Sequence, residues 1–291
     1  MTKRRKKRAS NRKFNPITSI LFVLAFAFWG IYQSSGGNLS TAVNSITSFN
    51  NSSSSSNSAK NTFTATSADT EYGGLSTSDY QKLANLDFQS GQKGYVVVNN
   101  NHSTLIKNAW KVNKVIYSNL DNLNRTSHSN TGFLEQRNVA NDSLRVRQFV
   151  NPTAWHSNRS SGEQIYNRGH LIAYSVSAGI DQNGNYEPNN QSGDQNNPKN
   201  LFTQTAYSNQ KVQTIFEGKV RQALRQGKKV IYQATPIFRN NELMARGINL
   251  QAVSTDGMLD FNVYIFNVQP GFQFNYQNGR ASKDNSLQVA N

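Results

Sequence analysis

The chain of 291 residues has no cysteine and only four histidines. The absence of thiols excludes disulfide bonds, zinc fingers, thiolate metal sites and cysteine nucleophiles. The nucleophile-elbow pattern Gly-x-Ser-x-Gly does not occur either, so a serine hydrolase of that kind has no support. Any site built on histidine therefore draws on one of four residues.

Acidic residues are about half as frequent as basic ones. The sequence has 31 Lys and Arg against 16 Asp and Glu, a formal net charge of +15 at pH 7. The first fourteen residues, MTKRRKKRASNRKF, carry eight of the basic residues and no acidic one, and the rest of the chain still has a net charge of +7. A basic chain favours a polyanionic partner such as nucleic acid, although a basic surface also serves solubility alone.

A long apolar run occurs once. Residues 17–32, ITSILFVLAFAFWGIY, are uncharged and follow the basic tail, residues 1–16. A membrane-spanning helix needs roughly 17–25 residues. With the uncharged residues that follow it, the run extends over residues 17–34 and reaches this length. The charge bias predicts a single-pass anchor in the cell membrane with everything after it outside the cell. The alternative is a signal peptide that is cleaved, so that the protein is secreted.

Large apolar side chains are scarce after this run. Residues 35–75 consist mainly of Ser, Thr and Asn. Such a segment buries too little apolar surface to offset the entropy of ordering, so we expect a flexible, disordered stalk. The globular domain is expected over residues 76–291, and no internal repeat is present.

Mixed strand and helix patterns in this domain predict an α+β fold. Strands are expected over residues 94–101, 143–150, 228–238 and 259–268. Helices are expected over residues 77–86 and 208–227. In the second helix the residues that recur at helical spacing are Val212, Ile215, Phe216, Val220 and Ala223, and Gly227 is its expected C-terminal cap.

One histidine stands in an unusual context. His170 lies in YNRGHLIAYSVSAG, directly after Gly169, which permits a close backbone approach. The preceding SSGEQIYNRG is polar and is expected to form a loop. Downstream, Asn200 follows Pro198 and Lys199, and Asn209 opens the predicted helix of residues 208–227. A buried structural histidine is the alternative interpretation of His170 by itself.

A polar stripe follows on that helix. At 100° per residue, four polar side chains lie along one side: Asn209, Gln213, Glu217 and Arg221. A solvated helix face has the same pattern, so the stripe alone does not indicate a site.

Taken together, the Arg-Gly-His core, the two downstream asparagines and the helix resemble the Asp-Arg-Gly-His signature of the DNA/RNA non-specific endonucleases. These are the ββα-metal or His-Me finger nucleases, and the similarity is greatest to membrane-anchored DNA-entry nucleases of Gram-positive bacteria. The resemblance implies a central antiparallel β-sheet flanked by helices, with a ββα-metal finger as the active site. It implies Mg²⁺-dependent hydrolysis of phosphodiester bonds in DNA, with RNA as a further substrate and Mn²⁺ as a substitute ion.

The resemblance also implies roles for individual residues. His170 corresponds to the general base that takes a proton from the attacking water, and Asn209 to the asparagine that binds Mg²⁺ directly. Asn200 corresponds to an asparagine that helps to organise the site. Glu217 is expected to hydrogen-bond water on the metal.

Arginines are expected to bind the substrate. The resemblance assigns Arg221 to the phosphate, and Arg168 to the phosphate or to the surroundings of the metal. Basic residues near the predicted strands, Arg147 among them, are candidates for a phosphate-binding groove, although solvated strand faces carry arginines as well. Contact mainly with phosphates implies binding without base readout.

One position departs from the family pattern. The family usually has Asp where this chain has Asn167, which removes a carboxylate from the surroundings of the metal. A non-catalytic DNA-binding or receptor protein, tethered at the cell surface, is therefore the alternative function. The sequence indicates no dimer interface, so it leaves the oligomeric state open.

Overall fold

The computed structural model describes residues 71–290. The expected basic tail, the apolar segment of residues 17–34 and the stalk up to residue 70 lie outside the described residues. Among residues 71–290, none of the helices combines the length and the apolarity that a membrane span requires. Tyr72 and Leu75 already belong to the packed structure: the Tyr72 ring meets Phe133 edge-on at 4.9 Å, and Leu75 is buried.

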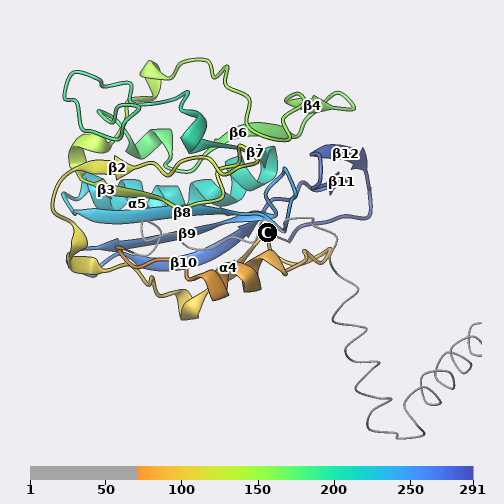
Figure 1. Cartoon of the computed structure of the whole chain (residues 1–291), viewed down its shortest axis with the longest axis horizontal. Coiled ribbons are helices and arrows are strands. Elements are labelled where there is room, and N and C mark those ends of the chain that lie inside the picture. Colours follow the sequence, from red (N-terminus) through yellow and green to blue (C-terminus); the bar gives the residue numbers. More distant parts are fainter. Residues whose placement is uncertain (1–70, 291) are drawn as a thin grey trace, which may run out of the picture. The chain divides into compact units, whose positions relative to one another are not determined.

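A six-stranded antiparallel sheet lies at the centre of the described residues (Figure 1). Its strands lie in the order β1 (Tyr95–Val97), β10 (Asp260–Phe266), β9 (Gly247–Ser254), β8 (Val230–Ile237), β3 (Asn130–Leu134) and β2 (Lys114–Ile116). Successive side chains of a strand point to opposite faces of the sheet, and in β8 and β9 every residue is buried, so both faces of the central sheet are covered. The predicted α+β fold with a central antiparallel sheet is confirmed, as are the strands predicted over residues 228–238 and 259–268.

Helices cover both faces of this sheet (Figure 1). On one face lies α5 (Thr214–Arg225), whose apolar side chains share a buried cluster with Tyr232 of β8. On the other face lies α4 (Thr77–Ala84), where Tyr80 packs with Ile237 of β8. The hydroxyl of Tyr80 also accepts a hydrogen bond from the backbone of the chain just after β8. The predicted helix at residues 77–86 is thus confirmed.

A second sheet of two strands leads into α5. β6 (Tyr166–His170) pairs antiparallel with β7 (Leu201–Thr205), and the chain continues through the π-helix η7 (Ser208–Gln213) into α5. The register places His170 opposite Leu201, at the end of the pair. This strand–strand–helix unit carries the candidate site.

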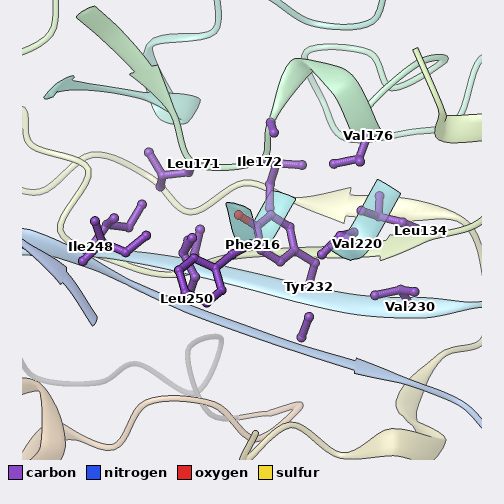
Figure 2. Close-up of a cluster of buried hydrophobic side chains, with 14 of the residues drawn as sticks. Leu134, Leu171, Ile172, Val176, Phe216, Val220, Val230, Tyr232, Ile248 and Leu250 are labelled. Atoms are coloured by element: carbon purple, nitrogen blue, oxygen red, sulfur yellow. The ribbon is translucent and has the colours of Figure 1, made fainter. Parts of the chain in front are cut away.

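The apolar residues after His170 anchor it to the core. Figure 2 shows Leu171, Ile172 and Val176 on the α5 side of the central sheet, near Phe216. All three side chains are fully buried. Burial of apolar side chains is the main favourable contribution to folding, so this run fixes the position of the histidine that precedes it.

The remaining elements are short. They are η1 (Asn99–Asn101), η2 (Lys107–Ala109), η3 (Gln136–Asn138), η4 (Asp142–Leu144), β4 (Arg159–Ser160), β5 (Glu163–Gln164), η5 (Tyr174–Val176), η6 (Pro198–Asn200), β11 (Phe272–Asn275) and β12 (Arg280–Lys283).

The strand predicted over residues 143–150 is wrong. After the turn η4 this segment is irregular, because side chains from another loop take its backbone groups. Gln195 Oε1 accepts a hydrogen bond from the N–H of Val146, and Asn196 Oδ1 accepts one from the N–H of Phe149. Alternation of apolar and polar residues does not show whether the backbone groups of a segment will form hydrogen bonds with a neighbouring strand or with side chains.

The loop predicted before His170 is also wrong, because residues 159–160 and 163–164 form the hairpin β4–β5 and the last four residues of the predicted loop, 166–169, belong to β6. The pairing partner of β6 lies about thirty residues downstream, so the local sequence gives no sign of it. The predicted strand at residues 94–101 is shorter than expected. It ends at Val97, and three consecutive asparagines with positive φ then form η1.

The helix predicted over residues 208–227 exists but is not uniform. Its first six residues form the π-helix η7 and only the rest is α-helical. The wider turn shifts the apolar face, so Ile215 is 51% exposed although it fits the helical spacing. Gly227 has a φ of +76° just beyond the helix, as expected for a C-terminal cap.

Candidate active site

A polar pocket of about 420 Å³ opens beside β6 and the start of α5. Five side chains singled out from the sequence line it: Asn167, Arg168, His170, Asn209 and Glu217. Arg145 lines it as well. Three others lie outside its lining: Arg147, Asn200 and Arg221. The tertiary structure thus gathers the motif histidine and the helix asparagine at one place.

His170 is half-buried, and its Nε2 lies 3.2 Å from the backbone carbonyl oxygen of Gln195. A carbonyl oxygen only accepts hydrogen bonds, so this contact assigns the ring proton to Nε2 and leaves Nδ1 unprotonated. Gln148 Nε2, another donor, lies farther from this nitrogen, at 3.5 Å. Burial lowers the pKa of His170 to about 4, an effect that the Gln195 carbonyl opposes and the charge of Arg145 strengthens. The imidazole is therefore neutral near pH 7.

Asn209 is held by a chain of side-chain amides. Asn167 Nδ2 donates to Asn209 Oδ1 at 2.9 Å, and Asn209 Nδ2 donates to Gln204 Oε1 at 2.9 Å. Gln204 Nε2 donates to Gln213 Oε1 at 2.8 Å, and Gln213 Nε2 donates to Glu217 Oε1 at 2.7 Å. Because each amide both donates and accepts, the chain fixes the orientation of Asn209.

Gln204 was missed in the sequence, yet it explains the glycine of the motif. A Cβ at Gly169 would lie 2.2 Å from Gln204 Oε1, so a larger residue would displace the glutamine. A glutamine on a strand has no recognisable motif. Only the β6–β7 register, which sets Asn167 opposite Gln204, reveals its part in the site.

Asn200 is fully buried and acts on the backbone beyond His170. Its Oδ1 accepts a hydrogen bond from the N–H of Ile172 at 2.9 Å, and its Nδ2 donates to the carbonyl of Ile172 at 3.0 Å. These two contacts hold the chain two residues past the histidine. The geometry therefore supports an organising role for Asn200, away from the pocket.

Arg168 is the arginine most firmly placed at the pocket. Its guanidinium carbon lies 4.3 Å from the centre of the Trp155 ring, and its Nη2 donates to Asn151 Oδ1 at 2.7 Å. Burial, and then the positive charge of Arg147, lowers the pKa of Arg168. Arg145 adds an exposed guanidinium to the same pocket. Like charges gathered in this way favour an anionic ligand.

Glu217 lies deeper, and burial raises the pKa of its carboxyl group. The hydrogen bond from Gln213 opposes this shift, as do the charges of Arg221 and Arg145. Arg221 therefore acts on the pocket through its charge, although its side chain is not part of the lining.

The oxygen atoms at the pocket that could bind a metal suit a hard cation. Asn209 Oδ1 accepts the hydrogen bond from Asn167 and keeps a second lone pair, and Glu217 supplies carboxylate oxygen. Within residues 71–290, no three His, Asp or Glu side chains gather so as to hold a metal ion. A cation at this pocket therefore rests on few protein ligands and keeps several waters, which is the coordination that Mg²⁺ tolerates best.

Comparison with known proteins shows the family of the chain. A family model for DNA/RNA non-specific endonucleases matches residues 103–256, which include all of β6, β7 and α5. The chain belongs to the DNA/RNA non-specific endonuclease family, a family of hydrolases. The sequence resemblance to this family is confirmed.

Individual relatives are streptococcal. The chain is 30% identical to NucA from Streptococcus agalactiae with magnesium ion bound, over 72% of this chain and 97% of that one, with a TM-score of 0.56. The same protein with no metal bound gives 31% identity over 71% and 96% of the two chains, with a TM-score of 0.55. A deoxyribonuclease from Streptococcus dysgalactiae subsp. equisimilis is 40% identical over 50 residues, 17% of this chain and 15% of that protein. The match thus spans a small part of that curated relative.

Proposed function

We propose that the protein is a Mg²⁺-dependent, sequence-nonspecific endonuclease that hydrolyses phosphodiester bonds of DNA, with RNA as a further substrate. The observation that carries this proposal is the shared pocket. A neutral imidazole with an unprotonated Nδ1 faces the same space as the amide of Asn209 and the guanidinium of Arg168. Family membership and the similarity to a magnesium-bound nuclease support it.

The histidine is the base in the proposed mechanism. Nδ1 of His170 takes one proton from a water molecule, and the water oxygen attacks phosphorus. The bond from phosphorus to the 3′ oxygen breaks as the new bond forms, and solvent supplies the proton for the leaving oxygen. The products are a 5′-phosphate and a 3′-hydroxyl. The contact from Nε2 to the Gln195 carbonyl orients the ring and stabilises the imidazolium that forms.

The other residues bind and orient. Asn209 is the proposed direct ligand of Mg²⁺, and Glu217 the proposed hydrogen-bond partner of its water. When bound, the ion supplies positive charge that stabilises the transition state. Arg168 and Arg145 hold phosphate oxygens and Arg147 extends the positive surface, which gives binding without base readout.

The charge pattern of the first residues supports a location at the cell surface. We propose residues 1–16 as a cytoplasmic tail, residues 17–34 as a membrane anchor and residues 35–70 as a stalk, because Tyr72 and Leu75 already belong to the packed structure. This arrangement places the nuclease domain outside the cell, as in the membrane-anchored DNA-entry nucleases that the sequence resembles. Secretion after signal cleavage is the alternative.

A non-catalytic DNA-binding protein is the second candidate function. It is favoured by the hydrogen bond from Asn167 Nδ2 to Asn209 Oδ1, which engages the oxygen that would bind the metal. A carboxylate at position 167 would not donate in this way.

Chelation separates the two candidates. With supercoiled plasmid DNA and Mg²⁺, the full chain is expected to produce nicked and linear DNA, and EDTA is expected to stop cleavage completely. The reason is that few protein ligands hold the ion, so a chelator removes it readily. Gel electrophoresis of timed samples measures this result. A protein that retards DNA equally with and without EDTA, and cuts it with neither Mg²⁺ nor Mn²⁺, would support the second candidate instead.

The acid limb of the pH profile is expected to lie well below that of an ordinary histidine. Burial lowers the pKa of His170 to about 4, and the neutral ring is the active form. Activity should therefore persist from about pH 7 down to about pH 5 and fall only near pH 4, whereas an unperturbed histidine is half protonated near pH 6.5. The value of kcat/KM on a short labelled oligonucleotide, at saturating Mg²⁺, measures this.

The pH profile needs a control for unfolding of the protein at low pH. Because the pKa of His170 is lower in the folded chain than in the unfolded chain, its neutral form adds stability above about pH 6.5, and this contribution is lost towards pH 4. Circular dichroism at each pH separates unfolding from titration of the base. A half-maximal rate near pH 6.5 in a folded protein contradicts the assignment.

A further inference from the structure

An exposed strap crosses beside the pocket. We define the strap as residues 144–151, the last residue of η4 and the segment that follows it. Among residues 71–290, three of the nine exposed large apolar side chains lie in it: Leu144 (36% exposed), Val146 (52%) and Phe149 (73%). Two exposed arginines, Arg145 and Arg147, stand between them. An aromatic ring this exposed beside arginines is typical of a binding surface.

The strap is fixed to the loop that holds the catalytic histidine. Gln195 Oε1 accepts from the N–H of Val146 at 2.8 Å, and Gln195 Nε2 donates to the carbonyl of Leu144 at 3.1 Å. Asn196 Oδ1 accepts from the N–H of Phe149 at 2.9 Å. The backbone carbonyl of Gln195 is also the group that contacts His170 Nε2. These hydrogen bonds therefore fix the position of the strap relative to the proposed base, His170.

Phe149 is next in the chain to a residue that lines the pocket. Its neighbour Gln148 lines the pocket, and Gln148 Nε2 donates to the backbone carbonyl of Arg168 at 3.2 Å. Consecutive Cα atoms lie about 3.8 Å apart, so the backbone of Phe149 is one residue step from that of Gln148, close to where a nucleotide adjacent to the bound phosphate would lie. Its ring faces solvent and not the core, which leaves an apolar face for a ligand.

We propose that Phe149 is a stacking subsite for one unpaired nucleobase adjacent to the scissile phosphate. This inference rests on the proposed nuclease function and adds a substrate preference to it. Every nucleobase has a flat face, so stacking adds affinity without sequence specificity. Bases in a duplex stack on one another and do not present that face. The strap therefore favours single-stranded or frayed DNA over intact duplex.

The test measures binding without cleavage. In EDTA, fluorescence anisotropy gives the Kd of the full chain for a labelled single strand, for the same strand with abasic sugars, and for a hairpin duplex. The change Phe149→Ala is expected to weaken binding of the single strand about 5- to 150-fold, which corresponds to the loss of one stacked base. Binding of the abasic strand and of the duplex should stay unchanged. Phe149→Trp should keep the affinity of the native protein.

A matched control is Met258→Ala, since Met258 is 78% exposed and lies in the turn between β9 and β10. It should leave all three affinities as they are. An equal loss on the abasic strand, or no loss at all, overturns the stacking proposal. So does a change in the mass of the protein in solution without a change in DNA affinity, because Phe149 would then contact a second copy.

Failure of the subsite and failure of the function give different results. If the native chain cuts plasmid with Mg²⁺ but Phe149→Ala keeps the native ratio of single-strand to duplex kcat/KM, the subsite is wrong and the nuclease stands. If the native chain cuts nothing yet shows the expected pattern of Kd values, the subsite stands and the nuclease function is wrong.

Discussion

Replacement of His170 by alanine is expected to lower the rate of DNA cleavage by about 10²–10⁴-fold, the usual effect of removing a general base. The structure gives the physical reason. The Nε2 contact with Gln195 leaves Nδ1 as the unprotonated nitrogen of the His170 ring, and no other histidine lines the pocket. Single-turnover cleavage of an oligonucleotide measures the effect on the chemical step. DNA binding should change little, because arginines supply the phosphate contacts.

Two controls accompany this variant. His102→Ala removes an exposed histidine that contacts Asp260 at 2.9 Å and lies outside the lining of the pocket, so it should cleave at the native rate. Added imidazole should restore part of the activity of His170→Ala, because a free base can enter the space that the side chain leaves. Near-native cleavage by a folded His170→Ala protein would falsify the assignment of the base.

Replacement of Asn209 by alanine is expected to weaken binding of the divalent ion by at least about 10- to 100-fold, the range for changes in the surroundings of a metal ligand. Asn209 is the proposed direct ligand, and among residues 71–290 no group of three His, Asp or Glu side chains offers an alternative site. The change also leaves Asn167 Nδ2 and Gln204 Oε1 without the partner that each now has. Electron paramagnetic resonance of bound Mn²⁺ measures the affinity directly, and the Mg²⁺ concentration for half-maximal cleavage measures it through activity.

The change Asn167→Asp is expected to have the opposite effect on the affinity for the divalent ion. This change replaces the donor at Asn209 Oδ1 with a carboxylate oxygen, so it frees the proposed ligand and adds negative charge beside it. Ion binding should become tighter, while Gln164 Nε2, which now donates to Asn167 Oδ1 at 2.9 Å, can still donate to the new side chain. Native Mn²⁺ affinity in a folded Asn209→Ala protein would show that the ion binds elsewhere.

The motif and the helix were predictable because their signals are local. The residues Asn167, Arg168, Gly169 and His170 are consecutive, and Asn209 starts a segment whose apolar spacing indicates a helix. Strands β8 and β10 were predictable because each is a run of alternating residues rich in β-branched and aromatic side chains between turn residues. These features depend on neighbours within one or two turns of chain, so a single sequence carries them.

The supporting residues were not predictable for the opposite reason. Gln204 and Gln195 acquire their parts through contacts with residues 5 to 51 positions away. Strand β6 was not predicted because its partner strand is distant in the chain. The strand predicted over residues 143–150 does not form, because glutamine and asparagine side chains bind its backbone in place of a neighbouring strand. Hydrogen bonds between distant amides leave no periodic trace in a sequence.

The sequence by itself determined the α+β fold, the basic character and the family resemblance, because each follows from composition or from short local patterns, and the resemblance in turn implied the candidate base and metal ligand. Only the tertiary structure decided which nitrogen of His170 is free, that Asn200 and Arg221 lie outside the pocket, and that Phe149 lies exposed beside it. These depend on which distant groups meet. Burial and hydrogen-bond partners, and not residue type alone, set the protonation and orientation of a side chain.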